Sequence, residues 1–417
     1  MADEQATAAN EPRRIVIVGG GIAGLEALLA LRDLAGDRVR ITLVAPEPDF
    51  TYKPLAVEEP FTLQPAERRE LEPAAREQGA EFVQAAVVSV SPQEHGVELA
   101  DGSRLEYETL VVCVGARQVS PYRNATTFRL SGEPMGIDEL VPPGGNGGSQ
   151  RVALVVPGGA TWPLPIYELA LMARRRADES GRHDLEYVVV TPEDAPLALF
   201  GSVPSDAVAE LLRARRIGVT TASYVHEDDA GELIVTPGDR PLDADHVIAL
   251  PILEGPAIRG LPADDHGFIP IDGHARVQGA DDVYAAGDGT TFPIKQGGLA
   301  TLQADAAAEH IAAGVGAEIE PKPFRPVLRG QLITGGESLQ MSHELMGGAG
   351  EGEAGLDHLW WPPHKVSGRY LAAWLGEGIP HADFEPPGHP VDVEVALSDE
   401  WHHEPMALDP YRAPEID

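Results

Sequence analysis

The feature that most constrains this chain is a pattern that it contains twice: an apolar strand, a glycine turn, a helix and a second strand. The first copy reads RIVIVGGGIAGLEALLALRDL and then VRITLVAPEPDF, and the second reads RVALVVPGGATWPLPIYELALMARRR and then LEYVVVTPEDAP. Strand, tight turn and helix in this order form the mononucleotide-binding half of a doubly wound sheet. The two copies predict an α/β protein with two Rossmann-like domains, the second inserted in the first, plus a small C-terminal module.

The domain limits follow from where this patterning stops. The segment VPPGGNGGSQ, Val141–Gln150, is too rich in glycine and proline to pack and predicts a flexible joint between the two copies. We expect a disordered N-terminus at 1–12, a first domain from 13–140 and 261–325, a second at 150–260, and the C-terminal module at 326–417. Apolar runs predict strands at Arg14–Val18, Val39–Ala45, Thr109–Val114, Arg151–Val156, Tyr187–Thr191, Val247–Leu250 and Val283–Ala286.

The first glycine turn is complete. Gly19, Gly21 and Gly24 give G-x-G-x-x-G directly between an apolar strand and a helix. Backbone N–H groups of such a turn, with the positive end of the helix dipole, bind a pyrophosphate. An acid for the ribose is expected at the end of the second strand, where this chain has Ala45; Glu47, two residues later, is either that ligand or a solvated loop carboxylate.

A second motif, GADDVYAAGD, ends at Asp288. Together with the first glycine turn it resembles the flavin motifs of the FAD-dependent pyridine nucleotide-disulfide oxidoreductase superfamily. In that superfamily the final Asp holds a ribitol hydroxyl, and the helix that follows directs its N-terminus at the flavin ring. The resemblance implies that FAD is the cofactor, since a carboxylate accepts hydrogen bonds from a polyol.

Two further stretches extend the resemblance. In TLVVCVGAR, Gly115 matches the superfamily's strand-end glycine, and FTYKPLAVEEPF resembles the flavin-side loop of type II NADH dehydrogenases and sulfide:quinone oxidoreductases. Lys53 and Lys295 are the candidate catalytic residues, as cations beside the ring, with surface solvation as the alternative. Gln296 and Gln303 either bond the pyrimidine edge or cap a helix. The expected cofactor contacts are Gly19, Gly21, Ile22, Ala23, Gly24, Glu47, Lys53, Val87, Gly115, Gly287, Asp288, Lys295, Gln296 and Gly298.

The second glycine turn is damaged. Pro157 replaces its first glycine, Trp162 stands where the third should be, and TWPLP delays the helix. Proline lacks the N–H that a phosphate needs, and an indole fills the space of the pyrophosphate. The second strand ends in Thr191, with Glu193 displaced as Glu47 is. We therefore expect a retained fold that no longer binds a nicotinamide nucleotide.

This damaged turn resembles that of sulfide:quinone oxidoreductases and of the flavoprotein subunit of flavocytochrome c sulfide dehydrogenase. Those enzymes act through paired cysteines, whereas Cys113 is the one cysteine of this chain. Their covalent route of sulfide oxidation, and disulfide reductase chemistry, are therefore not expected here. Cys113 lies in a predicted strand and is expected to be packed.

The composition limits the classes of binding partner that are expected. A formal charge of −35 repels phosphate backbones, so no nucleic acid partner is expected. The N-terminal residues resemble no secretory signal, no run of apolar residues is long enough to span a bilayer, and a cytoplasmic location is predicted.

The C-terminal module contains two ambiguous features. Val366, Tyr370 and Trp374 form a stripe at helical spacing within Leu359–Pro380; we favour core packing or a homodimer contact over membrane docking. The histidines of EWHHEP, with His381 and His389, lack the spacing of a metal site, and no metal is expected.

The predicted function is an FAD-dependent oxidoreductase that passes electrons from a non-nicotinamide donor to a quinone-like or protein acceptor. One alternative is an NAD(P)H-dependent FAD oxidoreductase of the NADH:quinone type with an atypical second site. The other is a non-catalytic FAD-binding partner subunit.

Overall fold

The computed structural model describes residues 11–62, 66–130, 132, 134–144, 149–345, 352–360 and 362–376. The predicted disordered segment 1–12 lies outside the described residues except for Glu11 and Pro12, which belong to no helix or strand. The histidines of EWHHEP, His381 and His389 also lie outside them.

The first sheet is parallel, and its strands come from both ends of the chain. Its order is β20 (Val283–Ala285), β9 (Thr109–Val112), β1 (Arg13–Val18), β2 (Val39–Ala45) and β5 (Glu81–Gln84). The helices α1 (Ile22–Ala35) and α7 (Gly297–Gly314) pack against each other, and α3 (Leu71–Glu77) packs beside β5. An antiparallel sheet of β6 (Val87–Ser91), β7 (Gly96–Leu99) and β8 (Arg104–Glu106) completes this part of the molecule.

The central strand β1 is buried on both faces, as strands of covered parallel sheets are. Because side chains alternate along a strand, Ile15 and Ile17 join the apolar cluster under α1 and α7. Val16 and Val18 point the other way, into the cluster formed with the β6–β8 sheet.

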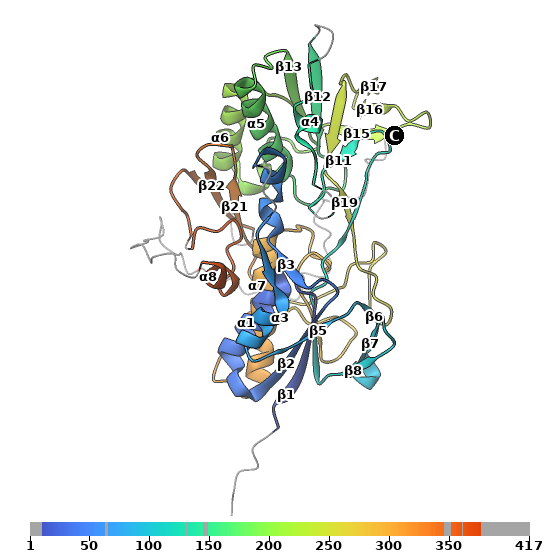
Figure 1. The fold of residues 1–417 in the computed structure, drawn as a ribbon, viewed down its shortest axis with the longest axis vertical. Coiled ribbons are helices and arrows are strands. Elements are labelled where there is room, and N and C mark those ends of the chain that lie inside the picture. The colour runs from blue at the N-terminus through green and yellow to red at the C-terminus, as the bar shows by residue number, and fades with distance from the viewer. Residues whose placement is uncertain are drawn as a thin grey trace, which may run out of the picture.

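The second sheet has the same parallel architecture. Its order is β11 (Thr126–Thr127), β18 (His246–Ala249), β12 (Gln150–Val155), β13 (Leu185–Val190) and β14 (Gly218–Thr220). The helices α5 (Leu164–Glu179) and α6 (Ser202–Ala214) accompany it, with an antiparallel sheet of β15 (Tyr224–Glu227), β16 (Leu233–Thr236) and β17 (Arg240–Pro241). Figure 1 shows the two large sheets at opposite ends of the long axis. The predicted fold class is confirmed.

Two antiparallel segments, β10 (Arg117–Val119) and β19 (Ile252–Glu254), pair where the chain enters and leaves the second sheet. After β10 the chain enters the second sheet, because β11 pairs with β18 of that sheet. Residues of the predicted first domain thus contribute a strand to the second sheet.

The C-terminal module contains β21 (Val327–Leu332), β22 (Leu339–Glu344), β23 (Glu353–Gly355) and the short helix α8 (Leu371–Leu375). β21 contacts α5 and α7, and β23 contacts α6, so the module joins the two halves (Figure 1). The remaining short elements are β3 (Asp49–Thr51), α2 (Glu59–Thr62), β4 (Arg68–Glu70) and α4 (Ile137–Leu140), with 3-10 turns at Gly36–Arg38, Lys53–Glu58, Pro92–Glu94 and Ala198–Phe200.

The predicted aromatic stripe is only partly helical. Val366 precedes α8 and is buried against the first domain, and Tyr370 lies just before the helix. Trp374 packs on the same cluster, with the guanidinium of Arg69 4.5 Å from its ring centroid. The stripe therefore serves as packing within the chain. None of the helices in the described ranges has both the length and the apolar character needed to cross a bilayer.

Candidate functional site

The glycine turn after β1 is shaped by two close approaches of backbone to backbone. A Cβ on Gly19, where φ is +111°, would stand 2.2 Å from the carbonyl oxygen of Cys113. A Cβ on Gly24 would stand 1.8 Å from the carbonyl oxygen of Gly19, so only glycine lets α1 begin this close to the strand. Gly21 differs, because its Cβ would meet nothing within 4 Å. The turn is closed toward the sheet and open toward the space in front of α1.

Three strand ends meet at this turn. Val18 and Val112 end the adjacent strands β1 and β9, and the Cys113 N–H donates to the carbonyl oxygen of Val18 at 2.7 Å. β20 pairs with β9, and the Ala286 N–H donates to the carbonyl oxygen of Val112 at 3.0 Å. The predicted site residues Gly19, Gly115 and Gly287 therefore lie at the carboxyl edge of one sheet, where α/β proteins bind ligands.

The expected contacts at the two ends of this edge are also placed. Ile22 and Ala23 open α1, and Ala23 lies 3.2 Å from where a Cβ on Gly287 would be. Glu47 is exposed in the bend after β2. The Ala85 N–H donates to the carbonyl oxygen of Ala45 at 2.9 Å, which brings the start of β6, at Val87, to the same edge.

Asp288 follows Gly287 and is the acid of this site. Its carboxylate receives no hydrogen bond from the described residues. Burial raises the pKa of the Asp288 carboxyl, while the ammonium groups of Lys295 and Lys53 oppose that shift. The structure thus brings the two predicted lysines and the predicted acid into one electrostatic environment. A partly buried carboxylate without donors is matched by a ligand that offers hydroxyl groups.

The two lysines differ in exposure. Lys53 is exposed, whereas Lys295 is 6% exposed and its ammonium donates to the carbonyl oxygen of Thr290. The Lys295 ammonium also lies 3.9 Å from the ring centroid of Phe268. Burial lowers the pKa of Lys295 to about 8, and the carboxylates of Asp288 and Asp264 limit the decrease. Lys295 is therefore a buried cation that can exchange its proton near neutral pH.

The predicted amides are bound by protein groups. The side-chain oxygen of Gln296 accepts from the Leu299 N–H at 2.9 Å and so caps α7, and its amide donates to the carbonyl oxygen of Arg329 at 3.0 Å. The Gln303 oxygen accepts from the Gly287 N–H at 2.8 Å. Of the two readings left open by the sequence, helix capping describes Gln296. Gly298, in the first turn of α7, lies beside Gln296 and Ser367.

A set of supporting residues was missed by sequence reasoning. A Cβ on Gly297 would stand 2.7 Å from Val366, which places the C-terminal segment against the N-terminus of α7. The Tyr52 hydroxyl accepts from the Val366 N–H at 2.8 Å. Glu26, on α1 and fully buried, accepts from the Tyr370 N–H at 2.9 Å and the Leu371 N–H at 2.6 Å. The one sequence signal that could have indicated this contact was Glu26, a glutamate on an otherwise apolar helix face.

The second glycine turn offers fewer donors. α5 begins at Leu164, and Pro163 and Pro165 have no N–H. The Ile166 N–H donates to the carbonyl oxygen of Pro163 at 3.1 Å, so it is bound within the turn. Trp162 packs edge-on against Phe200, with ring centroids 5.7 Å apart. A helix N-terminus that has two prolines in its first turn and an indole beside it is poorly suited to a pyrophosphate.

Glu193, the displaced acid of the second unit, is turned inward. Its carboxylate accepts from the Tyr167 hydroxyl at 2.6 Å and from the Thr191 hydroxyl at 2.9 Å. Burial raises the pKa of Glu193 to about 7. Both hydrogen bonds are accepted by Oε2 and link this acid to α5 and to the end of β13, whereas Oε1 is buried without a hydrogen-bond partner among the described residues.

Cys113 is buried behind the first turn, and burial raises the pKa of its thiol to about 12. A thiol with such a pKa is not a nucleophile at neutral pH. No cluster of three or more metal-ligating side chains occurs in the described part of the chain.

The residues at the first glycine turn fit a bound dinucleotide. Gly21 opens the space in front of a helix N-terminus, and Asp288 stands at the neighbouring strand end without a donor. These are the groups that a pyrophosphate and a polyol need, and FAD contains both.

Comparison with known proteins agrees with this geometry. A family model described as pyridine nucleotide-disulphide oxidoreductase matches residues 13–309. Rhodocoxin reductase of Rhodococcus erythropolis is 27% identical over 312 residues, which are 69% of this chain and 68% of that protein. The ferredoxin reductase component of chlorobenzene dioxygenase from Cupriavidus sp. (strain PS12) is 24% identical over 80% of this chain and 81% of that protein. The sulfide:quinone oxidoreductase structure of Aquifex aeolicus superposes with a TM-score of 0.70 at 19% identity, covering 80% of this chain and 84% of that one.

Proposed function

Because the chain belongs to the pyridine nucleotide-disulphide oxidoreductase family and is an FAD-dependent oxidoreductase, we propose that its electron donor is not a nicotinamide nucleotide. The supporting observation is the second glycine turn. Pro163 and Pro165 lack N–H groups, and Trp162 packs on Phe200 beside the start of α5. The Glu193 carboxylate, which a ribose would need, accepts from Tyr167 and Thr191.

The acceptor is a quinone-like carrier or a redox protein. Proteins similar to this chain are reductases of both kinds, as their names state: a ferredoxin reductase component and a sulfide-quinone reductase. In the quinone case, a donor that is oxidised loses two electrons and two protons, and the quinone takes up the same to give a quinol. Bound FAD supplies the two-electron chemistry between them.

Within this proposal each residue has a limited role. Gly19, Gly21 and Gly24 shape the turn that would hold the pyrophosphate, and the Asp288 carboxylate would accept hydrogen bonds from the ribitol chain. Lys295 provides a buried positive charge whose pKa is about 8, so it can hold or release a proton at the site. Lys53 provides an exposed one. The thiol of Cys113, with its pKa near 12, takes no part.

The test is anaerobic reduction of the purified holoenzyme, followed by flavin absorbance. NADH, NADPH, sulfide, a low-molecular-mass thiol and a quinol are added separately at micromolar concentrations, and dithionite shows that the flavin can be reduced. We expect dithionite and at least one non-nicotinamide donor to bleach the flavin, and the two nicotinamides to leave it oxidised. Rapid bleaching by NADH or NADPH would contradict the proposal.

The rival function is an NAD(P)H-dependent reductase, and the family name itself favours it. It requires a nicotinamide nucleotide to bind without the usual turn. The same absorbance experiment separates the two functions, because a nicotinamide donor that works at micromolar concentration requires a working second site.

A further inference from the structure

The last described part of the chain lies across both helices of the first domain. We call residues 366–371 the clasp segment, which leads into the short helix α8 (Figure 1). A Cβ on Gly297 of α7 would lie 2.7 Å from Val366, and a Cβ on Gly368 would lie 2.8 Å from the carboxylate of Glu26 on α1. The clasp segment is therefore packed closely against α1 and α7.

The clasp segment is bound to two parts of the chain in which we expect cofactor contacts. The Val366 N–H donates to the Tyr52 hydroxyl at 2.8 Å, and Tyr52 directly precedes Lys53. At the N-terminus of α7, a Cβ on Gly298 would lie 3.3 Å from the hydroxyl of Ser367. A displaced clasp segment would therefore free both the flavin-side loop and the start of α7.

Glu26 holds the clasp segment by its backbone. Its side chain is fully buried, and each of its two oxygens accepts one main-chain hydrogen bond. The Tyr370 N–H donates to Oε1 at 2.9 Å, and the Leu371 N–H donates to Oε2 at 2.6 Å. Hydrogen bonds to a charged acceptor are the stronger ones, so the charge of Glu26 contributes to docking.

Glu26 shares a proton with a second acid. Its carboxyl group is hydrogen-bonded to that of Asp305 on α7, and such a bond requires a proton, because two carboxylates offer only acceptors. Burial raises the pKa of Asp305, and the Glu26 carboxylate raises it further. Burial also raises the pKa of Glu26, while the N–H groups of Tyr370 and Leu371 oppose that shift. At neutral pH the pair therefore keeps one proton.

The other charged groups around the pair do not replace this proton. Arg369 of the clasp segment lowers the pKa of Asp305, and Glu309 of α7 raises it. The Arg369 guanidinium lies 3.7 Å from Glu309 and its side chain is 60% exposed, so it neutralises the pair only weakly. On α1, Asp33 is hydrogen-bonded to the Tyr370 hydroxyl and adds a further acid.

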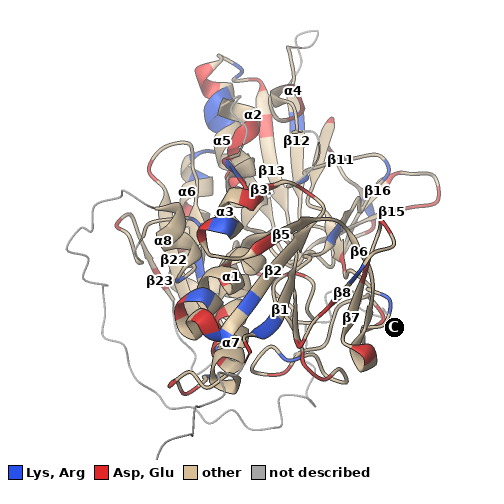
Figure 2. Cartoon of the chain, turned by 60° about the horizontal axis from the view of Figure 1, so that its bottom comes forward, with Lys and Arg blue, Asp and Glu red and all other residues tan. Residues whose placement is uncertain are grey.

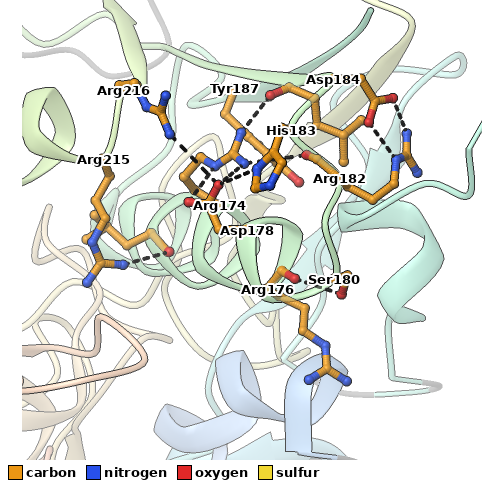
Figure 3. A network of polar contacts seen from close by, with 12 residues as sticks. Arg174, Arg176, Asp178, Ser180, Arg182, His183, Asp184, Tyr187, Arg215 and Arg216 are labelled. Carbon is orange, nitrogen blue, oxygen red and sulfur yellow. Dashed lines mark hydrogen bonds and ion pairs between the residues drawn. The ribbon is translucent and has the colours of Figure 1, made fainter. Parts of the chain in front are cut away.

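Acids with cationic partners behave differently. Figure 2 shows acidic and basic residues interspersed over many of the helices and strands. Asp178 is one such acid, since it binds Arg174 and lies 4.0 Å from Arg216 (Figure 3). The hydrogen bond from Arg174 lowers the pKa of Asp178, so this acid is ionised at neutral pH without a shared proton.

Loss of the shared proton would leave two negative charges side by side in a largely buried position. The two acids cannot move apart easily, because α1 and α7 pack against each other as core helices. The clasp segment is a single layer over Glu26, so its release admits water to the pair while the helices stay in place. Hydration of the two charges favours that release.

We propose that Glu26 and Asp305 form a proton-dependent fastening of the FAD site. While the pair keeps its proton, Glu26 holds the clasp segment against Tyr52 and the N-terminus of α7. When the proton is lost, the clasp segment detaches and the cofactor is bound less tightly. Glu26 is a positioning residue in this arrangement, which is independent of the donor that reduces the flavin.

The direction of the pH effect follows from linkage. The docked state binds the proton more tightly than the released state, so docking weakens as the pH rises above the ordinary range of an aspartate. One proton changes the docking equilibrium by at most about tenfold for each pH unit.

Hydrogen exchange of the oxidised holoenzyme tests the fastening, with rates corrected for intrinsic exchange from about pH 6 to about pH 9. We expect the protection of a peptide covering 366–372 to fall by up to about tenfold for each pH unit, while β1 stays protected. The rate of FAD dissociation should rise in parallel. In Asp305→Asn both should become independent of pH, because the amide still donates to Glu26 and does not ionise.

Two further variants complete the test. Glu26→Gln should leave the clasp segment unprotected at every pH and speed FAD dissociation. Asp178→Asn is the matched control: it removes an acid with cationic partners and should keep the pH dependence of the unaltered protein. Asp305→Asn exchanges one hydrogen-bond donor for another, so it decides the proposal even where Glu26→Gln is too unstable to purify.

Four results would overturn the proposal. They are protection of the clasp segment that does not depend on pH, an unchanged pH dependence in Asp305→Asn, loss of protection in β1 together with the clasp segment, and FAD dissociation that does not follow it. No electron donor is added in these measurements, so their outcome is separate from that of the donor test.

Discussion

The carbonyl oxygen of Gly19 occupies the position next to Gly24 where a side chain would begin: a Cβ on Gly24 would lie 1.8 Å from that oxygen. The contact holds the start of α1 against the end of β1. It also directs the helix N-terminus at the open space in front of Gly21, where a Cβ would meet nothing within 4 Å. Two glycines of one motif therefore have separable roles.

We expect Gly24→Ala to destabilise the protein by about 3 kcal/mol, because the methyl group would overlap backbone that cannot move away. Gly21→Ala should leave the melting temperature of the FAD-free protein unchanged, because its methyl group points into open space, and should lower FAD content by filling the pyrophosphate position. Thermal melts and the flavin-to-protein absorbance ratio measure the two effects. Equal behaviour of the two variants would contradict this division.

Asp288→Ala should weaken FAD binding by about 10- to 100-fold, the range for losing hydrogen bonds to a charged group. The reason is that Asp288 receives no hydrogen bond from the described residues and is free for a ligand. Asp281→Ala is the matched control, since Asp281 is exposed in the same segment. FAD titration of the apoprotein, followed by fluorescence quenching, gives both dissociation constants. Similar constants for the two variants would exclude Asp288 from the site.

Lys365→Met should lower the free energy of unfolding by about 3–5 kcal/mol, because it leaves the buried carboxylate of Glu168 without its charged partner. The Lys365 ammonium lies 2.7 Å from both carboxylate oxygens of Glu168, which is fully buried. Arg76→Met, which breaks an exposed pair with Glu72, should cost less than about 1 kcal/mol. In the double variant E168Q/K365M, we expect part of the lost free energy of unfolding to be recovered. Urea unfolding measures all three, and an unchanged midpoint for Lys365→Met would refute the prediction.

Glu168 also predicts a pH dependence. Burial raises its pKa to about 6 in the folded protein, even with Lys365 beside it. The folded state therefore holds this proton more tightly than the unfolded chain, and the contribution to stability falls as the pH rises from about 4.5 to about 6. Glu168→Gln should flatten that part of a plot of unfolding free energy against pH. A Glu168→Gln profile parallel to that of the unaltered protein would be the contrary result.

A second pH effect comes from the carboxyl pair of Glu26 and Asp305. Burial raises the pKa of Asp305, and the nearby Glu26 carboxylate raises it further, while Arg369 opposes the shift and Glu309 adds to it. Stability should therefore decline as the pH rises above the ordinary range of an aspartate, because the folded state loses a proton that it binds tightly. Asp305→Asn should remove this decline. The exposed Asp37→Asn serves as control, and melting temperatures across the pH range measure both.

Trp162→Gly should not by itself create a nicotinamide site. Pro163 and Pro165 still deny N–H groups to a pyrophosphate, and the Ile166 N–H is bound to the carbonyl oxygen of Pro163. The variant should lose stability, since the edge-on contact with Phe200 disappears. Anaerobic addition of NADH to the variant checks the first expectation, and rapid flavin bleaching would show that the indole alone closes the site.

Most strands of the two sheets were predictable because their signals are local, but the edge strands β5, β11 and β14 were not predicted. The predicted strands Arg14–Val18 and Val39–Ala45 appear as Arg13–Val18 and Val39–Ala45, since both segments are rich in the β-branched and aliphatic residues that suit a largely buried parallel strand. The aromatic stripe from Val366 to Trp374 was interpreted as one helix, yet only Leu371–Leu375 is helical. Helical spacing alone did not show that Lys365 and Val366 lie outside the helix, where they bind Glu168 and Tyr52.

By itself, the sequence determined the glycine turn, its damaged copy and the inserted order of the two domains, because each depends on backbone freedom or missing N–H groups within a few neighbouring residues. Only the tertiary structure decided what supports the site. Glu26 and Tyr370 are 344 residues apart, and Tyr52 and Val366 are 314 apart. Contacts between residues so far apart in the sequence form only when the C-terminal module packs against α1 and α7. A local sequence pattern therefore cannot show which buried polar groups will bind each other there.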